Sequence, residues 1–358
     1  MNRPSVLVIS NQTSAAGDPG YSEALREMMS LGLVSGFTYA PTGHVAQESQ
    51  VSREMRLIES VRASRDDVVV ALSIKDQISR VDEVVAALSG RPLLYWEGDP
   101  WGRRKPIPTR MAAWLQASDV VFSVGGQPQT DLLHRHGAAV VVHTVHTYDH
   151  VLFAREERAF SWEDPHHSAV FIGSNLSRVP LLTGLPGSVG RRRVVSGLRT
   201  RLGNAFLIGG RGWPRSWRAH EVSFPDQGRF IQQGRILANW DHNPHIADYA
   251  SDRLAIAMIS GRAQVTTRHG GMAWVAPESA GVFLRQRPSD VIRTVLSLSE
   301  HDADHLRELG AASRRWALGR LSHREAMRYI LAHAIDGIEK PAGDPWDSLP
   351  QTSVRGHG

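Results

Sequence analysis

The 358-residue sequence has no cysteine, and lysine occurs only at positions 75, 105 and 340. The lack of cysteine excludes disulfide frameworks, thiolate metal ligands and cysteine nucleophiles. No apolar run approaches the ~20 residues that span a membrane, and Val6–Ile9 is too short and too β-branched for the apolar core of a signal peptide. These absences predict a cytoplasmic protein without an integral membrane segment.

Positive charge therefore comes almost entirely from arginine, and the net charge is +5. Arginine binds phosphate in a bidentate manner better than lysine does, which makes an anionic ligand plausible. Two basic clusters, Arg103–Lys105 and Arg191–Arg193, fit either solvated loops or a nucleic-acid surface. A hydrophobic content of 41% and a charged content of 22% are typical of globular proteins, and the length fits two domains.

The first half alternates between apolar β-type runs and amphipathic helical patterns, which predicts a doubly wound parallel sheet. The expected strands are Val6–Ile9, Val34–Tyr39, Val68–Leu72, Pro92–Trp96, Val120–Val124 and Val140–His143. A second α/β set follows, with strands at Ala169–Gly173, Ala205–Ile208, Gln264–Thr267 and Val282–Leu284 and a mostly helical region over 288–333. The predicted organisation is a first domain over 1–155, a linker over 156–167, a second domain over 168–340 whose last helices pack back on the first, and a disordered tail over 341–358.

Ligands of such sheets bind at the carboxyl ends of the strands, so the loops that follow each strand are the candidate sites. In the first half, the small polar loop 11–20 can present amides or hydroxyls through Thr13, Ser14 and Gly17, although it lacks the GxGxxG and Walker A spacings. Tyr95–Trp101 places Glu97 and Asp99 between Trp96 and Trp101. Tryptophan faces pack on sugars, and a carboxylate binds hydroxyls or takes a proton; an aromatic-stapled turn is the alternative.

In the second half, Gly173, Ser174 and Arg178 suit a diphosphate, and Gly210, Arg211 and Trp213 can pack a base or ribose. The segment 251–274 predicts a helix that ends at Gly261, a strand that ends at Thr267, and a loop in which Gly270, Gly271 and Met272 approach a ligand. His242, His245 and Asp248 do not form an HExxH motif, so no metal site is predicted there. No GxSxG elbow is present either.

These residues resemble the GT-B glycosyltransferases, especially the branch related to the spore-maturation protein CgeB and the wider family 4-like enzymes. DHVLF at 149–153 is similar to the segment in which the family's chain crosses into the second domain. FIGSNLSRVPLL at 171–182 is similar to the opening strand of that domain and the arginine-bearing loop that follows it. DRLAIAMISGRAQVTT at 252–267 resembles the donor-site helix and strand, with Arg253 and Gly261 matching the family pattern. The resemblance implies that Arg253, Gly261 and Thr267 bind the donor. Ile256 and Trp274 stand where the family usually carries glutamates, which leaves Glu278 as a candidate for the donor ribose.

The resemblance implies two Rossmann-like domains facing across a cleft, and a cytoplasmic enzyme of the hexosyltransferase type. It would move a sugar from a nucleotide-diphosphate sugar to a hydroxyl or amine of a small-molecule, natural-product or glycan acceptor, without a metal or a cofactor. Arg178, Arg253 and the glycine-pair amides would bind the diphosphate. Asp99, Glu97 or Asp18 would be the base if the reaction inverts, and none is needed if it retains. A glycosyltransferase acting on modified bases in DNA and a non-catalytic GT-B-like binding protein remain alternatives.

Overall fold

The computed structural model describes residues 3–11, 18–43, 48–75, 77–102, 105–153, 165–175, 185–350 and 352–355. The chain forms two compact units, one made of Met1–Val145 with His323–Gly358 and the other of His146–Ser322. Each is built around its own parallel sheet. Among the described residues, no helix combines the length and the apolar character that crossing a membrane requires.

Unit 1 contains a seven-stranded sheet in the order β12-β6-β5-β4-β3-β1-β2, in which only the edge strand β12 is antiparallel. Its strands are β1 (Ser5–Ser10), β2 (Gly36–Pro41), β3 (Val68–Leu72), β4 (Leu93–Glu97), β5 (Val120–Ser123), β6 (Val140–His143) and β12 (Ser353–Val354). Its helices are α1 (Pro19–Ser30), α2 (Gln50–Ala63), α3 (Val81–Leu88), α4 (Thr109–Ala117), α5 (Gln129–Arg135) and α12 (His323–Leu331).

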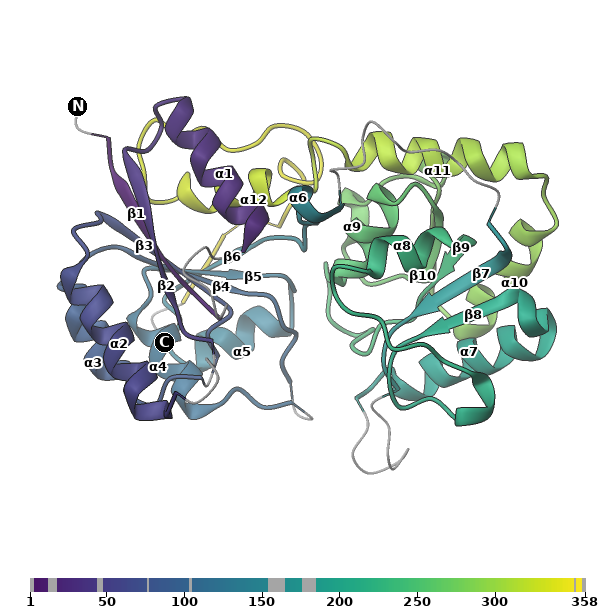
Figure 1. Ribbon diagram of the computed structural model, residues 1–358, viewed down its shortest axis with the longest axis horizontal. Coiled ribbons are helices and arrows are strands. Elements are labelled where there is room, and N and C mark those ends of the chain that lie inside the picture. Colours follow the sequence, from purple (N-terminus) through teal and green to yellow (C-terminus); the bar gives the residue numbers. More distant parts are fainter. Residues whose placement is uncertain are drawn as a thin grey trace. The chain divides into compact units, whose positions relative to one another are not determined.

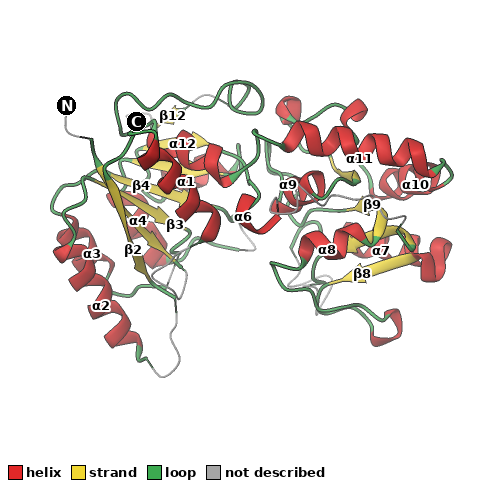
Figure 2. Cartoon of the chain, turned by 45° about the horizontal axis from the view of Figure 1, so that its top comes forward, coloured by secondary structure: helices red, strands yellow, loops and turns green. Residues whose placement is uncertain are grey.

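Helices cover both faces of this sheet, which is why its central strands are continuous apolar runs (Figure 1). Leu7, Val69 and Val121 belong to a fully buried core with residues of α2 to α5. On the other face, α12 packs beside α1 (Figures 1 and 2), and Phe122 meets the ring of Tyr329 edge-on at 6.2 Å. Unit 1 is therefore a three-layer α/β structure.

The end of the chain completes unit 1. Ser353 and Val354 pair with Val141 and Val140 of β6, and Trp346 is 6% exposed with its ring 4.9 Å from that of Tyr329. The expectation of a disordered tail over 341–358 is wrong for these described residues. A buried tryptophan and one edge pairing order a segment whose proline and glycine content predicts disorder.

Unit 2 contains a five-stranded, wholly parallel sheet in the order β11-β10-β9-β7-β8. Its strands are β7 (His167–Ile172), β8 (Phe206–Gly209), β9 (Gly234–Ala238), β10 (Ala263–Thr267) and β11 (Val282–Arg285). Its helices are α6 (His150–Phe153), α7 (Ser188–Leu202), α8 (Gln227–Gln232), α9 (Asp252–Ile259), α10 (Pro288–Ser299) and α11 (Ala303–Ala317). Helices α7 and α10 pack together on one face, and α8, α9 and α11 cover the other (Figure 1).

The predicted class, two doubly wound parallel-sheet domains, is confirmed. All six strands expected in the first half are present, as are four of the five in unit 2; β9, which lies at the centre of its sheet, was not predicted. The units divide after Val145 rather than after 155, and residues 323–340 belong to unit 1. The predicted linker lies largely outside the described residues.

Candidate functional site

The strand order of unit 2 fixes where a ligand can enter. Strand β7 has β8 on one side and β9 on the other, so the connections that leave β7 and β9 run in opposite directions. Loops at such a switch point diverge at the carboxyl edge of the sheet and leave a crevice. Gly173–Asn175 follow β7 at this edge, and Asn239–His242 follow β9.

A buried arginine contacts both loops at this switch point. In α7, Ser188, Arg191, Val194, Val195 and Leu198 form the buried stripe of an amphipathic helix, and Arg191 is only 2% exposed. Its Nε donates to the Trp240 carbonyl at 2.8 Å, and its Nη1 donates to the Ser174 carbonyl at 3.2 Å and to His242 Nε2 at 2.6 Å. The guanidinium group thus joins the loops that follow β7 and β9.

Two arginines lie close enough at this switch point to repel each other. Burial, followed by the like charge of Arg253, lowers the pKa of Arg191 to about 9, although Asp241 acts in the opposite direction. Arg253 lies in the first turn of α9, its side chain is 23% exposed, and its Nη1 is 3.7 Å from Asp252 Oδ1. A buried cation with a second cation nearby favours the binding of an anion, because the anion relieves both the desolvation and the repulsion.

Two glycines allow α7 to approach the end of β9 closely enough for these contacts. A Cβ atom on Gly187 would lie 2.0 Å from the Asp241 carbonyl oxygen, and one on Gly190 would lie 2.3 Å from Trp240 Nε1. The Gly187 amide also donates to the His242 carbonyl at 2.6 Å. The bare backbone at the start of α7 therefore determines where Arg191 is placed.

Gly210 provides a test of the packing between the loops after β7 and β8. Its φ is +111°, and a Cβ atom there would lie 2.5 Å from the Gly173 carbonyl oxygen. We expect Gly210→Ala to lower the free energy of unfolding by about 3 kcal/mol, since it adds a backbone clash to a left-handed strain of ~1–2 kcal/mol. Gly319→Ala is the matched control, because its φ is +71° but nothing lies within 4 Å of the added carbon. Equal losses for both variants in urea unfolding would contradict the argument.

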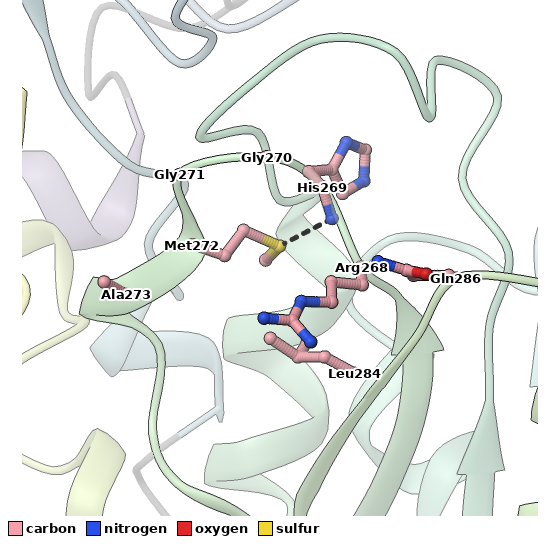
Figure 3. Close-up of a pocket in the computed structure, with 8 residues that line it drawn as sticks. All are labelled: Arg268, His269, Gly270, Gly271, Met272, Ala273, Leu284 and Gln286. Carbon is pink, nitrogen blue, oxygen red and sulfur yellow. Dashed lines mark hydrogen bonds between the residues drawn. The ribbon is translucent and has the colours of Figure 1, made fainter.

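A second cavity lies where β10 and β11 end. Its volume is about 480 Å³, and it is lined by Arg268, His269, Gly270, Gly271, Met272, Ala273, Leu284 and Gln286. In Figure 3 the side chains of Arg268 and Met272 point into it, whereas the ring of His269 points away. The Gly270 carbonyl accepts from the Asp248 amide at 2.7 Å, and a Cβ on Gly271 would lie 2.1 Å from Asp248 Oδ1. Glycine is required where this loop meets Asp248.

Three residues expected to bind the donor have structural roles instead. Gly261 ends α9 with a φ of +68° before β10 begins, so it lies at the amino edge of the sheet, away from the crevice. The buried Thr267 hydroxyl accepts from the Asp241 amide at 2.8 Å. Trp213 belongs to the core of unit 2, stacks on Trp217 and donates to the Gly173 carbonyl at 2.9 Å.

The positions where the family resemblance calls for glutamates are apolar core positions. Ile256 is fully buried, and Trp274 is 1% exposed. Glu278 is exposed and paired with Arg285 at 2.6 Å, and the exposed Arg211 is paired with Glu221. Arg178 lies outside the described residues. Of the expected donor residues, Gly173, Ser174, Gly210 and Arg253 gather at the crevice, and Gly270, Gly271 and Met272 line the second cavity.

In unit 1, Asp99 follows β4 and meets two of the chain's three lysines. Its Oδ2 is 2.9 Å from Lys105 Nζ and also contacts Lys75 Nζ. Burial raises the pKa of Asp99, but Lys105 and Lys75 outweigh it, so the pKa lies below its ordinary value. A carboxylate held in this way is a weak base, contrary to the role expected for it.

Glu97 is fully buried and cannot touch an acceptor, which also corrects its expected role as a base. Its carboxylate accepts from the Asp99 amide at 2.7 Å and from the Tyr95 hydroxyl at 3.1 Å. Burial raises its pKa to about 7, with Lys75 acting in the opposite direction. Beside it, Trp96 is half-buried, and Trp101 is buried with Lys105 Nζ 4.4 Å from its ring centre.

Asp18, the third expected base, caps α1 by accepting from the Gly20 amide at 3.2 Å and lies 3.4 Å from His323 Nδ1. Thr13, Ser14 and Gly17 lie outside the described residues, as do Arg103 and Arg104 of the first basic cluster. The second basic cluster is not a loop, since it lies in α7 with Arg191 buried and only Arg192 and Arg193 exposed.

No family model matches the chain, and no curated protein sequence matches it. Solved structures do show its fold, and the class they define is GT-B, with two Rossmann-like domains. Anabaena Alr3699/HepE, determined in complex with UDP-glucose, is 10% identical, with a TM-score of 0.56 over 92% of this chain and 99% of that one. A putative UDP-N-acetylglucosamine 2-epimerase from Listeria monocytogenes is 13% identical, with a TM-score of 0.52 over 95% and 98%. Staphylococcus aureus MnaA, determined with UDP, is 9% identical, with a TM-score of 0.53 over 95% and 99%.

Proposed function

We propose that this protein is a glycosyltransferase that uses a nucleotide-diphosphate sugar as donor, bound by unit 2. The observation that carries the proposal is the buried Arg191 beside Arg253 at the switch point between β7 and β9. The proposed ligand is the diphosphate, because two guanidinium groups match its charge and its multiple oxygens. The similar structures determined with UDP or UDP-glucose make uracil the first base to test.

In the proposed reaction, the acceptor oxygen or nitrogen attacks C1 of the donor sugar. The bond between C1 and the β-phosphate oxygen breaks, and its electron pair goes to that oxygen. Arg191, Arg253 and the amides of Gly270 and Gly271 would stabilise the negative charge that develops there. These groups supply positive potential without a metal or a cofactor in the proposed scheme.

The acceptor's proton has to go to a base. In the described part of unit 1, Glu97 is buried, Asp99 is held by two lysines and Asp18 caps a helix. This arrangement favours a retaining transfer, in which the departing phosphate oxygen takes the proton. The acceptor, a small molecule or a glycan, would lie on the unit 1 loops that carry Trp96 and Trp101.

The proposal is tested by binding and turnover of Arg253→Ala. Its dissociation constant for UDP should rise at least tenfold, about 1.4 kcal/mol, because a charge-assisted contact with the diphosphate is lost. Isothermal titration with UDP, GDP and dTDP measures this, and Arg307→Ala, an exposed arginine of α11 paired with Asp304, is the control. If none of these nucleotides binds the wild type, or Arg253→Ala binds as tightly as the control, the donor site is not here.

A second candidate is a UDP-sugar epimerase, favoured by the two solved UDP-N-acetylglucosamine 2-epimerases with TM-scores of 0.52 and 0.54. NMR of UDP-N-acetylglucosamine incubated with the enzyme distinguishes the two. Inversion at C2 without any acceptor identifies an epimerase. A new anomeric linkage that forms only when an acceptor is present identifies a transferase, and its configuration gives the stereochemistry.

A further inference from the structure

Two histidines lie on opposite sides of Asp241, and their partners differ in kind. His269 follows β10, its side chain is fully buried, and its Nε2 is 3.1 Å from Asp241 Oδ2. His242, the next residue after Asp241, points its Nε2 at Arg191 Nη1, 2.6 Å away. Because imidazole nitrogens can be donors or acceptors, the partners determine which nitrogens carry protons.

Both ring nitrogens of His269 face acceptors. Nδ1 is 2.9 Å from the Ile246 carbonyl oxygen, which can only accept, and Nε2 faces the carboxylate of Asp241. The other carboxylate oxygen, Oδ1, accepts from Asn239 Nδ2 at 3.1 Å, and the pKa of Asp241 lies well below its usual range because His269, Arg191 and Asn239 outweigh burial. Two acceptors match a ring that carries an N–H group on each nitrogen, as an imidazolium ring does.

His242 has the opposite requirement. The guanidinium of Arg191 can only donate, so Nε2 of His242 must present a lone pair. Its Nδ1 is 3.3 Å from Ser188 Oγ, which can accept the remaining N–H. Burial, Arg191 and Arg253 lower the pKa of His242 to about 3, although the Ser174 carbonyl and Asp241 act in the opposite direction. The ring is therefore neutral, with its proton on Nδ1.

The Asp241–His269 pair also controls how Arg191 is held. Asp241 stands between Trp240, whose carbonyl accepts from Arg191 Nε, and His242, whose ring accepts from Nη1. The His269 amide donates to Met272 Sδ at 3.2 Å across the Gly270–Gly271 turn (Figure 3). Displacing Asp241 would therefore move both of these acceptors, and displacing His269 would move the glycine turn.

We propose that Asp241 and His269 form a buried ion pair that positions both Arg191 and the Gly270–Gly271 turn, with His269 protonated and His242 neutral at pH 7. The other groups that face His269 are His245, Asp248 and Tyr249, the last with its ring 5.4 Å away. The effect of the pair on donor affinity rests on the proposed function, whereas the protonation states and the placement of Arg191 do not.

The first test is NMR of the full chain with ¹⁵N-labelled histidine, free of ligand, at pH 7. We expect His269 to show two protonated nitrogens and His242 to show a proton on Nδ1 only, with the signals assigned from His269→Gln and His242→Gln. A neutral His269 or a protonated His242 would overturn the proposal. This readout uses the folded wild type and needs neither donor nor turnover.

The second test follows the Arg191 Nε–H signal, assigned from its loss in Arg191→Lys. Asp241→Asn keeps the shape of the side chain but removes the charge, and Arg191 Nε–H should then exchange with solvent at least tenfold faster. Unchanged exchange would refute the positioning role. If the wild type binds UDP, Asp241→Asn should also weaken UDP binding at least tenfold. If the wild type does not bind UDP, only the assignment of the donor site fails, and the two NMR experiments still decide whether the ion pair positions Arg191.

Discussion

Replacing Arg191 by alanine is expected to weaken UDP binding at least 100-fold, about 2.7 kcal/mol. The buried guanidinium contacts Ser174, Trp240 and His242 and is more enclosed than that of Arg253. Removing it deletes the charge from the place where solvent screening is weakest. Arg191→Lys should recover part of the affinity, since it keeps the charge but not the planar fork.

The control for this prediction is Arg192→Ala, the next residue of α7, whose side chain is exposed. Both variants lose one positive charge from the same helix turn, so a general electrostatic effect would weaken binding equally in the two. Titration calorimetry at two ionic strengths separates the loss of a specific contact from a general loss of positive charge. UDP binding by Arg191→Ala within threefold of wild type would remove Arg191 from the donor site.

Glu97→Gln is expected to change how the stability of unit 1 depends on pH. The pKa of Glu97 is about 7 in the folded protein against 4.5 for an ordinary glutamate. Between pH 4.5 and pH 7 the unfolded chain releases the Glu97 proton, whereas the folded chain keeps it. The stabilisation that protonated Glu97 gives to the folded state is therefore complete below pH 4.5 and is lost as the pH rises through 7. The total loss is about 3 kcal/mol.

Glutamine cannot ionise, so the variant should lose less stability than wild type between pH 4.5 and 8.5. Urea unfolding at several pH values measures this difference. Glu59→Gln, at an exposed position of α2, is the control and should keep the slope of wild type. A variant with the same slope as wild type would show that Glu97 ionises normally in the folded state.

The fold was largely predictable because parallel strands covered on both faces are continuous apolar runs. Strands β1 and β3 and the helices between them can be recognised from such runs and from helical periodicity. Strand β9 is the exception, because its five residues, GRILA, include a glycine and an arginine and form too short an apolar run. Its environment in the sheet is supplied by β7, which comes two strands earlier in the chain, and by β10, the next strand after it.

Missing β9 also hid most of the candidate site. Asp241 and His242 follow this strand, and Arg191 reaches the same place from α7. The sequence did contain a signal for Arg191, since it falls on the apolar stripe with Val194, Val195 and Leu198. Gly261 and Thr267, two of the residues expected to bind the donor, have the right neighbours along the chain but make structural contacts. Sequence position does not tell which edge of a sheet a residue reaches. It also does not tell whether the polar group of a side chain already forms a hydrogen bond within the protein.

The order of the segments along the chain has a consequence for biosynthesis. Unit 1 is discontinuous, because α12 and β12 come from the last part of the chain while the rest of the unit is made first. The ribosome thus releases the partners of α1 and β6 only after all of unit 2 has been translated. Until then, one layer of unit 1 and one edge of its sheet are incomplete, whereas unit 2 is continuous and can fold as it emerges. Of the two units, the one whose synthesis begins earlier is therefore the one that is completed later.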